Sequence, residues 1–304
     1  MKIFISIASY QDPFLEITIR SAYDNSDKPE NLIFGVCDQS SKPIDINSFN
    51  FKDQIRYEHI DPFESQGPCW ARSKIQKNFN DEDYYLQIDS HMQFEKGWDS
   101  YLIKYIKKIK EINSPIHQLP IITCYPRSFD IKNFEKNEFE LNTNDINTHT
   151  IAYREDSMFM KNNYSRQIGS IALTEISHGY LIAAGFLFST KDFVNQIPYD
   201  PDYYFYGEEL SLMLRAFTRN FGIFHLPAIP IFHLYRDIVE VKRKLHWDES
   251  EDYLLFRDDV KGVFGNGADL KLYHDASHSY IENATGNLYI MARATDADMS
   301  FQCD

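Results

Sequence analysis

Apolar and polar residues follow a regular pattern along most of the chain. Short apolar runs alternate with longer stretches in which apolar residues recur every three or four positions. The short runs predict buried strands, and the longer stretches predict amphipathic helices. Strands are predicted at residues 2–8, 31–37, 54–60, 84–88, 119–124 and 223–233, helices at 14–23, 69–79, 98–112 and 208–217, and further ordered structure at 182–188. Because strands and helices alternate, we expect an α/β fold whose mostly parallel central sheet is flanked by helices.

Two parts of the chain depart from this alternation. Residues 127–166 are polar, rich in asparagine and without a clear period, which favours a long excursion or lid over core structure. Beyond Asp237, charged and aromatic residues are mixed in a way that indicates no particular role. We therefore expect one α/β domain over residues 1–237, which contains the excursion, and a C-terminal extension over residues 238–304.

The composition excludes some classes of partner. The chain has 304 residues, of which 43% are hydrophobic and 25% charged, as in ordinary folded proteins. Its net charge of −14 opposes binding to the phosphates of nucleic acids, so we expect no nucleic-acid partner. A protein this acidic needs a metal ion, an arginine or a helix N-terminus to hold an anionic ligand.

The location predicted from the sequence is cytoplasmic. The apolar run that follows Met1 is too short for a signal peptide, and no later stretch is long enough to cross a bilayer, so no membrane association is expected. The four cysteines are widely spaced and form no C-x-x-C pair, which predicts reduced thiols.

The strand predicted at 84–88 is followed at once by Asp89, Ser90 and His91. In open α/β sheets, ligands bind at the carboxyl ends of the strands. A carboxylate and an imidazole two residues apart can share one divalent cation there, and this mixture of oxygen and nitrogen suits Mn²⁺ better than Ca²⁺. The short D-x-H spacing is also common at turns, where the aspartate caps the next segment.

Further candidate residues lie at two predicted helix starts and one strand end. Arg72 is in the first turns of a helix that follows a Gly-Pro turn, and could contact an anion or form an ordinary surface ion pair. Glu208 and Glu209 follow Gly207, where the helix dipole alone favours acids. His233 follows an apolar run and is either a structural residue or a third metal ligand.

Taken in order, these segments resemble a known enzyme family. The resemblance covers residues 3–236 and is carried by Ile5–Pro13, Gly35–Gln39, Ser65–Arg72, Leu86–His91, Trp98–Asp99, Ala184–Phe186, Pro198–Pro201, Gly207–Glu209 and His233. The family is that of cytoplasmic UDP-GlcNAc transferases typified by the Skp1-hydroxyproline N-acetylglucosaminyltransferase. The chain is more distantly similar to the mucin-type polypeptide N-acetylgalactosaminyltransferases. Several blocks in the same order are more specific than any one motif.

The resemblance implies a GT-A nucleotide-sugar-binding domain and a transfer reaction that retains the anomeric configuration. N-acetylglucosamine would move from UDP-GlcNAc to a hydroxyl of a protein serine, threonine or hydroxyproline, or of a glycan. A divalent cation, Mn²⁺ or Mg²⁺, would offset the charge of the departing diphosphate. The implied roles are metal binding by Asp89, His91 and His233, nucleotide binding by Ala8, Ser9, Tyr10, Arg72, Asp89 and Ser90, and catalysis by Glu208 or Glu209.

Two other functions are compatible with the same residues. A catalytically inactive nucleotide-sugar or carbohydrate-binding module can have this fold, because a fold does not determine a function. A metal-dependent hydrolase would use the same ligands to activate water. Release of UDP from UDP-GlcNAc separates an active enzyme from a binding module, and a preference for an added acceptor separates a transferase from a hydrolase.

Overall fold

The computed structural model describes residues 1–112, 114–143, 148–153, 167–172, 174–205, 207–236, 243, 262–264 and 269–288. The chain forms two compact units, Met1–His246 and Trp247–Asp304. The predicted domain boundary after residue 237 lies outside the described residues. Within the described residues, no helix is long and apolar enough to span a membrane.

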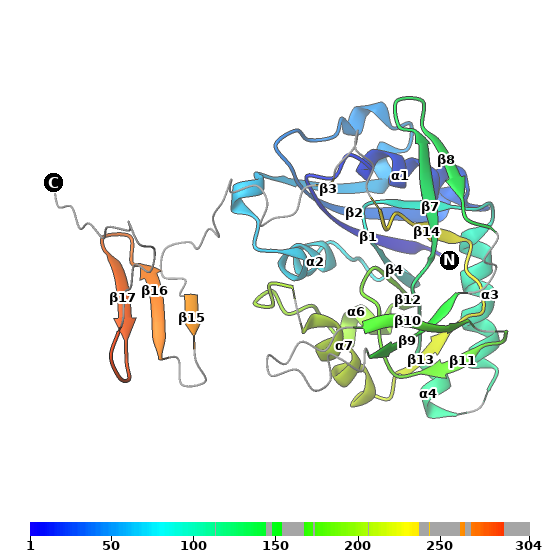
Figure 1. Ribbon diagram of the computed structural model, residues 1–304. Helices are drawn as coiled ribbons and strands as arrows, with labels where there is room; N and C mark the ends of the chain where they lie inside the picture. The colour runs from blue at the N-terminus through cyan, green and yellow to red at the C-terminus, as the bar shows by residue number, and fades with distance from the viewer. Residues whose placement is uncertain are drawn as a thin grey trace. The chain divides into compact units, whose positions relative to one another are not determined.

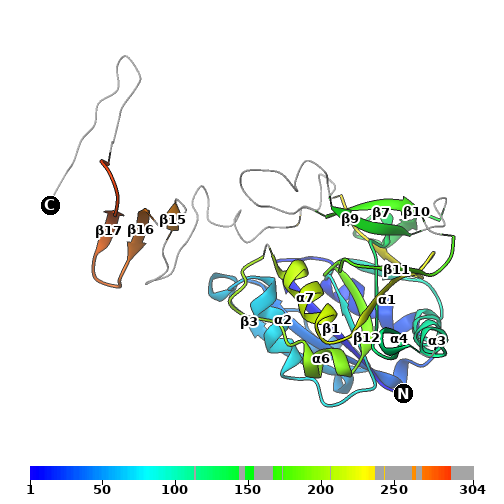
Figure 2. The same cartoon turned by 90° about the horizontal axis from the view of Figure 1, so that it is seen from below.

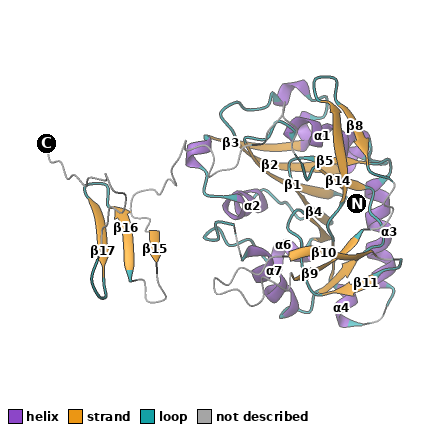
Figure 3. Ribbon diagram, in the orientation of Figure 1, coloured by secondary structure: helices purple, strands orange, loops and turns teal. Residues whose placement is uncertain are grey.

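An eight-stranded sheet forms the centre of the first unit (Figures 1 and 3). In spatial order its strands are β11 (Ser177–Gly179), β13 (Gly222–His225), β6 (Pro120–Thr123), β12 (Phe186–Thr190), β4 (Tyr84–Ile88), β1 (Ile3–Tyr10), β2 (Leu32–Gln39) and β3 (Ile55–Ile60). β11 and β12 run opposite to the other six. The sheet is therefore mainly parallel, and the predicted α/β fold class is confirmed.

Helices cover both faces of this sheet, as Figure 2 shows. They are α1 (Leu15–Asp24), α2 (Pro68–Gln76), α3 (Trp98–Lys110), α4 (Pro115–Gln118), α6 (Asp192–Gln196) and α7 (Glu208–Phe217), with short 3-10 turns at Pro29–Asn31, Ile46–Ser48, Lys52–Gln54 and Pro62–Glu64. Alternate residues of β1 point to opposite faces. Ile5 and Ile7 pack with apolar residues of α1 and α3, whereas Phe4 packs with those of α2, α6 and α7.

The run at 223–233 was predicted as one strand, and this prediction is wrong. It forms β13 in the central sheet and β14 (Ile231–His233) in a second sheet. Pro227 and Pro230 lie between the two strands, and proline has no N–H to donate to a strand ladder. Because of this break, His233 belongs to the second sheet and lies next to Asp89, at the end of β4.

The second sheet includes part of the expected excursion. Its order is β5 (Met92–Phe94), β14, β7 (Arg127–Asn133) and β8 (Glu138–Leu141). From Phe129 on, β7 alternates buried or half-buried side chains with exposed ones, and Phe129 packs in a small apolar cluster with Phe14 and Phe232. The prediction of a lid without regular structure is therefore wrong for this part. The sequence did not reveal these strands because their alternation is too short to stand out among polar residues. β9 (His149–Tyr153) and β10 (Gln167–Ala172) form a separate antiparallel pair.

The second unit contains an antiparallel three-stranded sheet. β16 (Leu270–His274) lies between β15 (Gly262–Phe264) and β17 (Ser279–Asn283). On one of its faces, the rings of Tyr273 and Tyr280 stack across the strands with their centroids 4.8 Å apart. Cross-strand aromatic pairs of this kind stabilise small sheets.

Candidate functional site

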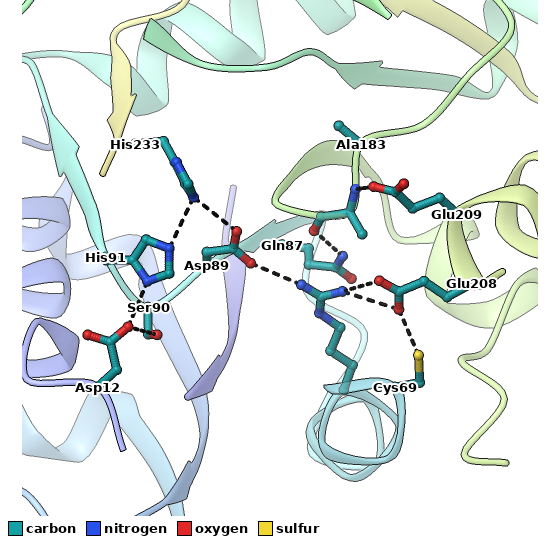
Figure 4. A network of polar contacts seen from close by, with 12 residues as sticks. Asp12, Cys69, Gln87, Asp89, Ser90, His91, Ala183, Glu208, Glu209 and His233 are labelled. Carbon is teal, nitrogen blue, oxygen red and sulfur yellow. Dashed lines mark hydrogen bonds and ion pairs between the residues drawn. The ribbon is translucent and has the colours of Figure 1, made fainter. Parts of the chain in front are cut away.

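Three side chains from two separate parts of the chain converge at the carboxyl end of β4 (Figure 4). Asp89 and His91 follow β4 directly, and His233 is the last residue of β14. β14 pairs with β5 so that His233 lies opposite Met92, the residue after His91. This antiparallel pairing brings the two histidines together, as predicted for a shared site.

The three side chains form a compact cluster of ligand atoms. Nε2 of His233 lies 3.1 Å from Nε2 of His91 and 3.2 Å from Oδ2 of Asp89. One ligand atom from each residue lies within 4.8 Å of the other two. An oxygen and two imidazole nitrogens at this spacing fit a divalent cation such as Mn²⁺.

The protonation states of the cluster suit metal binding. Burial opposes the ionised form of Asp89, but the hydrogen bond to His233 and the nearby His91 and Arg72 outweigh it and lower the pKa of Asp89. Burial lowers the pKa of His233 despite its contact with Asp89. At neutral pH the site therefore presents a carboxylate and a neutral His233 imidazole, which are the forms that coordinate metals.

Asp12 lies behind His91, and sequence reasoning assigned it no role of its own. Its Oδ2 is 2.6 Å from Nδ1 of His91 and accepts a hydrogen bond from the Ser90 hydroxyl at 2.7 Å, while its Oδ1 accepts one from the N–H of Phe14 at 2.8 Å. Burial would raise the pKa of Asp12, but His91 and these hydrogen bonds lower it. The sequence offered one signal: Asp12 comes soon after the apolar run at 2–8, much as Asp89 follows the run at 84–88.

Arg72 occupies the centre of the other half of the site. Its Nη2 lies 3.2 Å from Oδ1 of Asp89, and its Nη1 lies 3.1 Å from Oε1 of Glu208. The Arg72 side chain is only 6% exposed, so the alternative of an ordinary surface ion pair is wrong. Glu208 also accepts a hydrogen bond from the Cys69 thiol at 2.7 Å. Glu208 is therefore held by buried partners from α2.

Glu209 contacts different partners from Glu208, its neighbour at the start of α7 (Figure 4). Its Oε1 accepts a hydrogen bond from the backbone N–H of Ala184, at 2.8 Å. Burial raises the pKa of Glu209 to about 7, against an ordinary value of 4.5. Perturbed carboxyl groups of this kind are frequent where protons are exchanged with a substrate.

A cavity of about 240 Å³ connects these groups. Its lining includes Arg72, Asp89, Glu208, Glu209 and His233. A larger groove of about 650 Å³ lies at the amino ends of β1 and β2 and is lined mainly by α3 residues, but it contains none of the predicted site residues. The smaller cavity is the candidate site, because the ionisable groups converge there.

Of the predicted nucleotide-binding residues at the ends of β1 and β4, some line the cavity and others do not. Ala8 lines the cavity. Ser9 is buried, and its carbonyl accepts a hydrogen bond from the Gln39 side chain. Tyr10 is half-buried at the end of β1. Ser90 lies outside the cavity lining, and its hydroxyl donates a hydrogen bond to Asp12.

Solved structures that are similar to the chain in fold include the following two. The first is GalNAc-T7 crystallised with UDP, GalNAc and Mn²⁺, with a TM-score of 0.56, 13% identity and coverage of 78% of this chain and 44% of that one. The second is residues 1–349 of TarS from S. aureus, with a TM-score of 0.50, 13% identity and coverage of 77% of this chain and 60% of that one. The chain thus spans less than two thirds of either. At these identities the similarity shows the fold alone, and it confirms the GT-A type.

The family is shown by the sequence. Residues 2–49 and 42–261 match the family model described as Glycosyltransferase (GlcNAc). Because the match extends over more than half of the chain, the protein belongs to this glycosyltransferase family. No curated protein matches the chain in sequence. The acceptor implied by the resemblance to Skp1-type enzymes remains a prediction.

Proposed function

We propose that the protein transfers N-acetylglucosamine from UDP-GlcNAc to a hydroxyl acceptor and retains the anomeric configuration. The observation that carries this proposal is the convergence of Asp89, His91 and His233 beside a cavity that also contains Arg72 and two glutamates. The family description names GlcNAc, and the similar GalNAc-T7 structure contains UDP, a sugar and Mn²⁺. These comparisons support a nucleotide-sugar donor.

Asp89, His91 and His233 would hold a divalent cation, Mn²⁺ or Mg²⁺. When bound, the cation supplies positive charge to the diphosphate that leaves the sugar. The net charge of −14 makes such a local positive element necessary for an anionic donor. Ala8, Ser9 and Tyr10, at the end of β1, are the proposed contacts of the nucleoside.

Arg72 and the two glutamates have separate roles in this proposal. The guanidinium of Arg72 is held rigidly by Asp89 and Glu208, so it orients the donor without first losing side-chain freedom. Glu208 is bound by Arg72 and Cys69 and serves to fix that arrangement. Glu209, with a pKa of about 7, is the group suited to take or hold the proton of the acceptor hydroxyl.

The acceptor would approach past aromatic side chains at the edge of the cavity. Phe205 and Tyr235 line the cavity, yet they are 39% and 46% exposed. The Tyr235 hydroxyl donates to the carbonyl of Pro126 at 2.7 Å, which fixes the ring in place. Partly exposed rings suit either a sugar or an apolar peptide side chain, so both a protein and a glycan acceptor fit.

Incubation of the purified chain with several UDP-sugars and Mn²⁺ tests the proposal. We expect UDP release from UDP-GlcNAc that increases when a hydroxyproline peptide, a serine peptide or a glycan is added and that stops with a chelator. NMR of the product would show the retained configuration. Binding of UDP-GlcNAc without any UDP release would instead indicate a binding module. Release that is indifferent to every acceptor would indicate a hydrolase.

A further inference from the structure

We propose that Asp12 is a positioning residue that fixes the proton of His91 on Nδ1 and leaves Nε2 free to hold the cation. The inference rests on the metal site of the proposed function and concerns how the chain prepares one of its ligands. In metalloproteins, a carboxylate that accepts the second ring N–H of a histidine sets the tautomer and orientation of that ligand.

The contacts of Asp12 leave one arrangement of hydrogens. Its Oδ1 accepts from the backbone N–H of Phe14, which can only donate. Its Oδ2 receives the hydroxyl of Ser90 and lies 2.6 Å from Nδ1 of His91. The Asp12 side chain is 4% exposed, so water does not compete for these positions. A carboxylate that accepts at every contact requires Nδ1 of His91 to carry the hydrogen.

The other imidazole has no equivalent support. Nδ1 of His233 is buried and has no hydrogen-bond partner within the described part of the chain. Its Nε2 contacts both Asp89 and His91. The two histidines are therefore prepared differently: Asp12 keeps Nε2 of His91 free of hydrogen, whereas in the metal-free protein Asp89 and His91 both draw the hydrogen of His233 onto its Nε2.

Asp12→Asn tests whether Asp12 determines which ring nitrogen of His91 carries the hydrogen, because the variant keeps nearly the same side-chain shape. Asparagine has one oxygen and one NH₂ group in place of two acceptors. If the oxygen stays on Phe14, the NH₂ group faces Nδ1 of His91, and the ring must accept there and carry its hydrogen on Nε2. That tautomer cannot bind a metal through Nε2. Ser90→Ala is the matched control, because it removes a hydrogen bond to the same oxygen of Asp12 without changing the contact with His91.

The tautomer is measured by ¹⁵N NMR of histidine rings in the metal-free protein, with the His91 signals identified by their loss in His91→Gln. We expect hydrogen on Nδ1 of His91 in the wild type and in Ser90→Ala, and on Nε2 in Asp12→Asn. Titration with Mn²⁺ alone should show binding weakened about 10- to 100-fold in Asp12→Asn and unchanged in Ser90→Ala.

Three results would overturn the proposal. The first is hydrogen on Nε2 of His91 in the wild type, a measurement that does not depend on whether any variant folds. The second is an unchanged tautomer and Mn²⁺ affinity in Asp12→Asn. The third is an equal loss of affinity in Ser90→Ala. None of these readouts uses sugar transfer, so a failure of the proposed enzymatic function would be distinguished from a failure of the role of Asp12.

Discussion

The Nε2 atoms of His91 and His233 lie 3.1 Å apart, although 142 residues separate the two histidines in the sequence. Two ring nitrogens at this distance share a single hydrogen or a single cation, because two N–H groups would repel each other. The contact depends on the pairing of β14 with β5, which places Phe232 opposite Gln93 and His233 opposite Met92. The second sheet thus brings the last ligand of the cluster to the end of the first sheet.

Asp89→Ala removes the only carboxylate of the metal cluster and should abolish activity. We expect the affinity for Mn²⁺ and the rate of UDP release to fall about 100-fold or more, since the loss of one ligand and one charge removes several kcal/mol of stabilisation. Calorimetric Mn²⁺ titration and the UDP-release assay measure the two effects. Asp81→Ala, which removes a 70% exposed carboxylate paired with Lys191, serves as control and should change neither. Near-normal transfer by Asp89→Ala would contradict the metal assignment.

Gly185→Ala tests the site without removing any ligand. An added Cβ at Gly185 would come 2.6 Å from Oδ2 of Asp89, so this oxygen, which contacts His233, must shift. We expect Mn²⁺ to bind about 10- to 100-fold more weakly although all three ligands remain. Gly286→Ala is the control: a Cβ there meets no atom within 4 Å, and the strain of an alanine at its φ of +68° falls in the second unit, so Mn²⁺ affinity should not change. Equal affinities in the two variants would show that the position of Asp89 is not critical.

Arg72→Leu should destabilise the fold as well as the site. The substitution leaves Asp89 and Glu208 without their shared cation, and the loss of one partner from a buried ion pair typically costs about 3–5 kcal/mol. Urea denaturation of the metal-free protein measures this loss. Lys191→Leu breaks an exposed pair that solvent screens, and should cost far less. If the two variants lost similar amounts, the buried network would not be a main source of stability.

Glu209→Gln should change how stability and activity depend on pH. Because the pKa of Glu209 is raised from 4.5 to about 7 in the folded chain, the folded state holds a proton that the unfolded state has lost. The stability of the wild type relative to Glu209→Gln is therefore highest below pH 4.5 and falls as the pH rises through 7. Denaturation of both proteins at pH 5 and pH 8 checks the direction.

The raised pKa of Glu209 also leads to a prediction for the reaction. If Glu209 takes the acceptor proton, the rate of transfer in the wild type should rise with pH around 7, as the carboxylate forms. The variant keeps an oxygen that can accept from Ala184 but cannot take a proton, so it should be slow and lack this pH dependence. Parallel pH profiles in the two proteins would rule out Glu209 as the base.

Much of the central sheet could be predicted from the sequence because its strands are continuous apolar runs between polar turns. β1 and β4 were located in this way, and so were the helices that follow them. The opposite direction of β12 could not be predicted, because local periodicity does not record the direction of a strand in a sheet. The strands within 127–153 were missed because each buries only a few side chains.

The site was predictable only in part, for a similar reason. Asp89 and His91 are visible in the sequence because they directly follow an apolar strand. Asp12 and the direction of the Ser90 hydroxyl were not predicted, because their hydrogen bond joins segments 78 residues apart. Such contacts are set by the pairing of β1 with β4 and not by any local motif.

The placement of β12 has a consequence for how the protein is made. β12 fills the position between β4 and β6, and the backbone N–H of Asp89 donates to the carbonyl of Gly185, just before β12. Until a ribosome has synthesised this segment, β4 has one unpaired edge and the cation-binding loop lacks a neighbour. A truncated chain that ends before Phe186 would therefore be prone to aggregate and would not serve as an isolated donor-binding fragment.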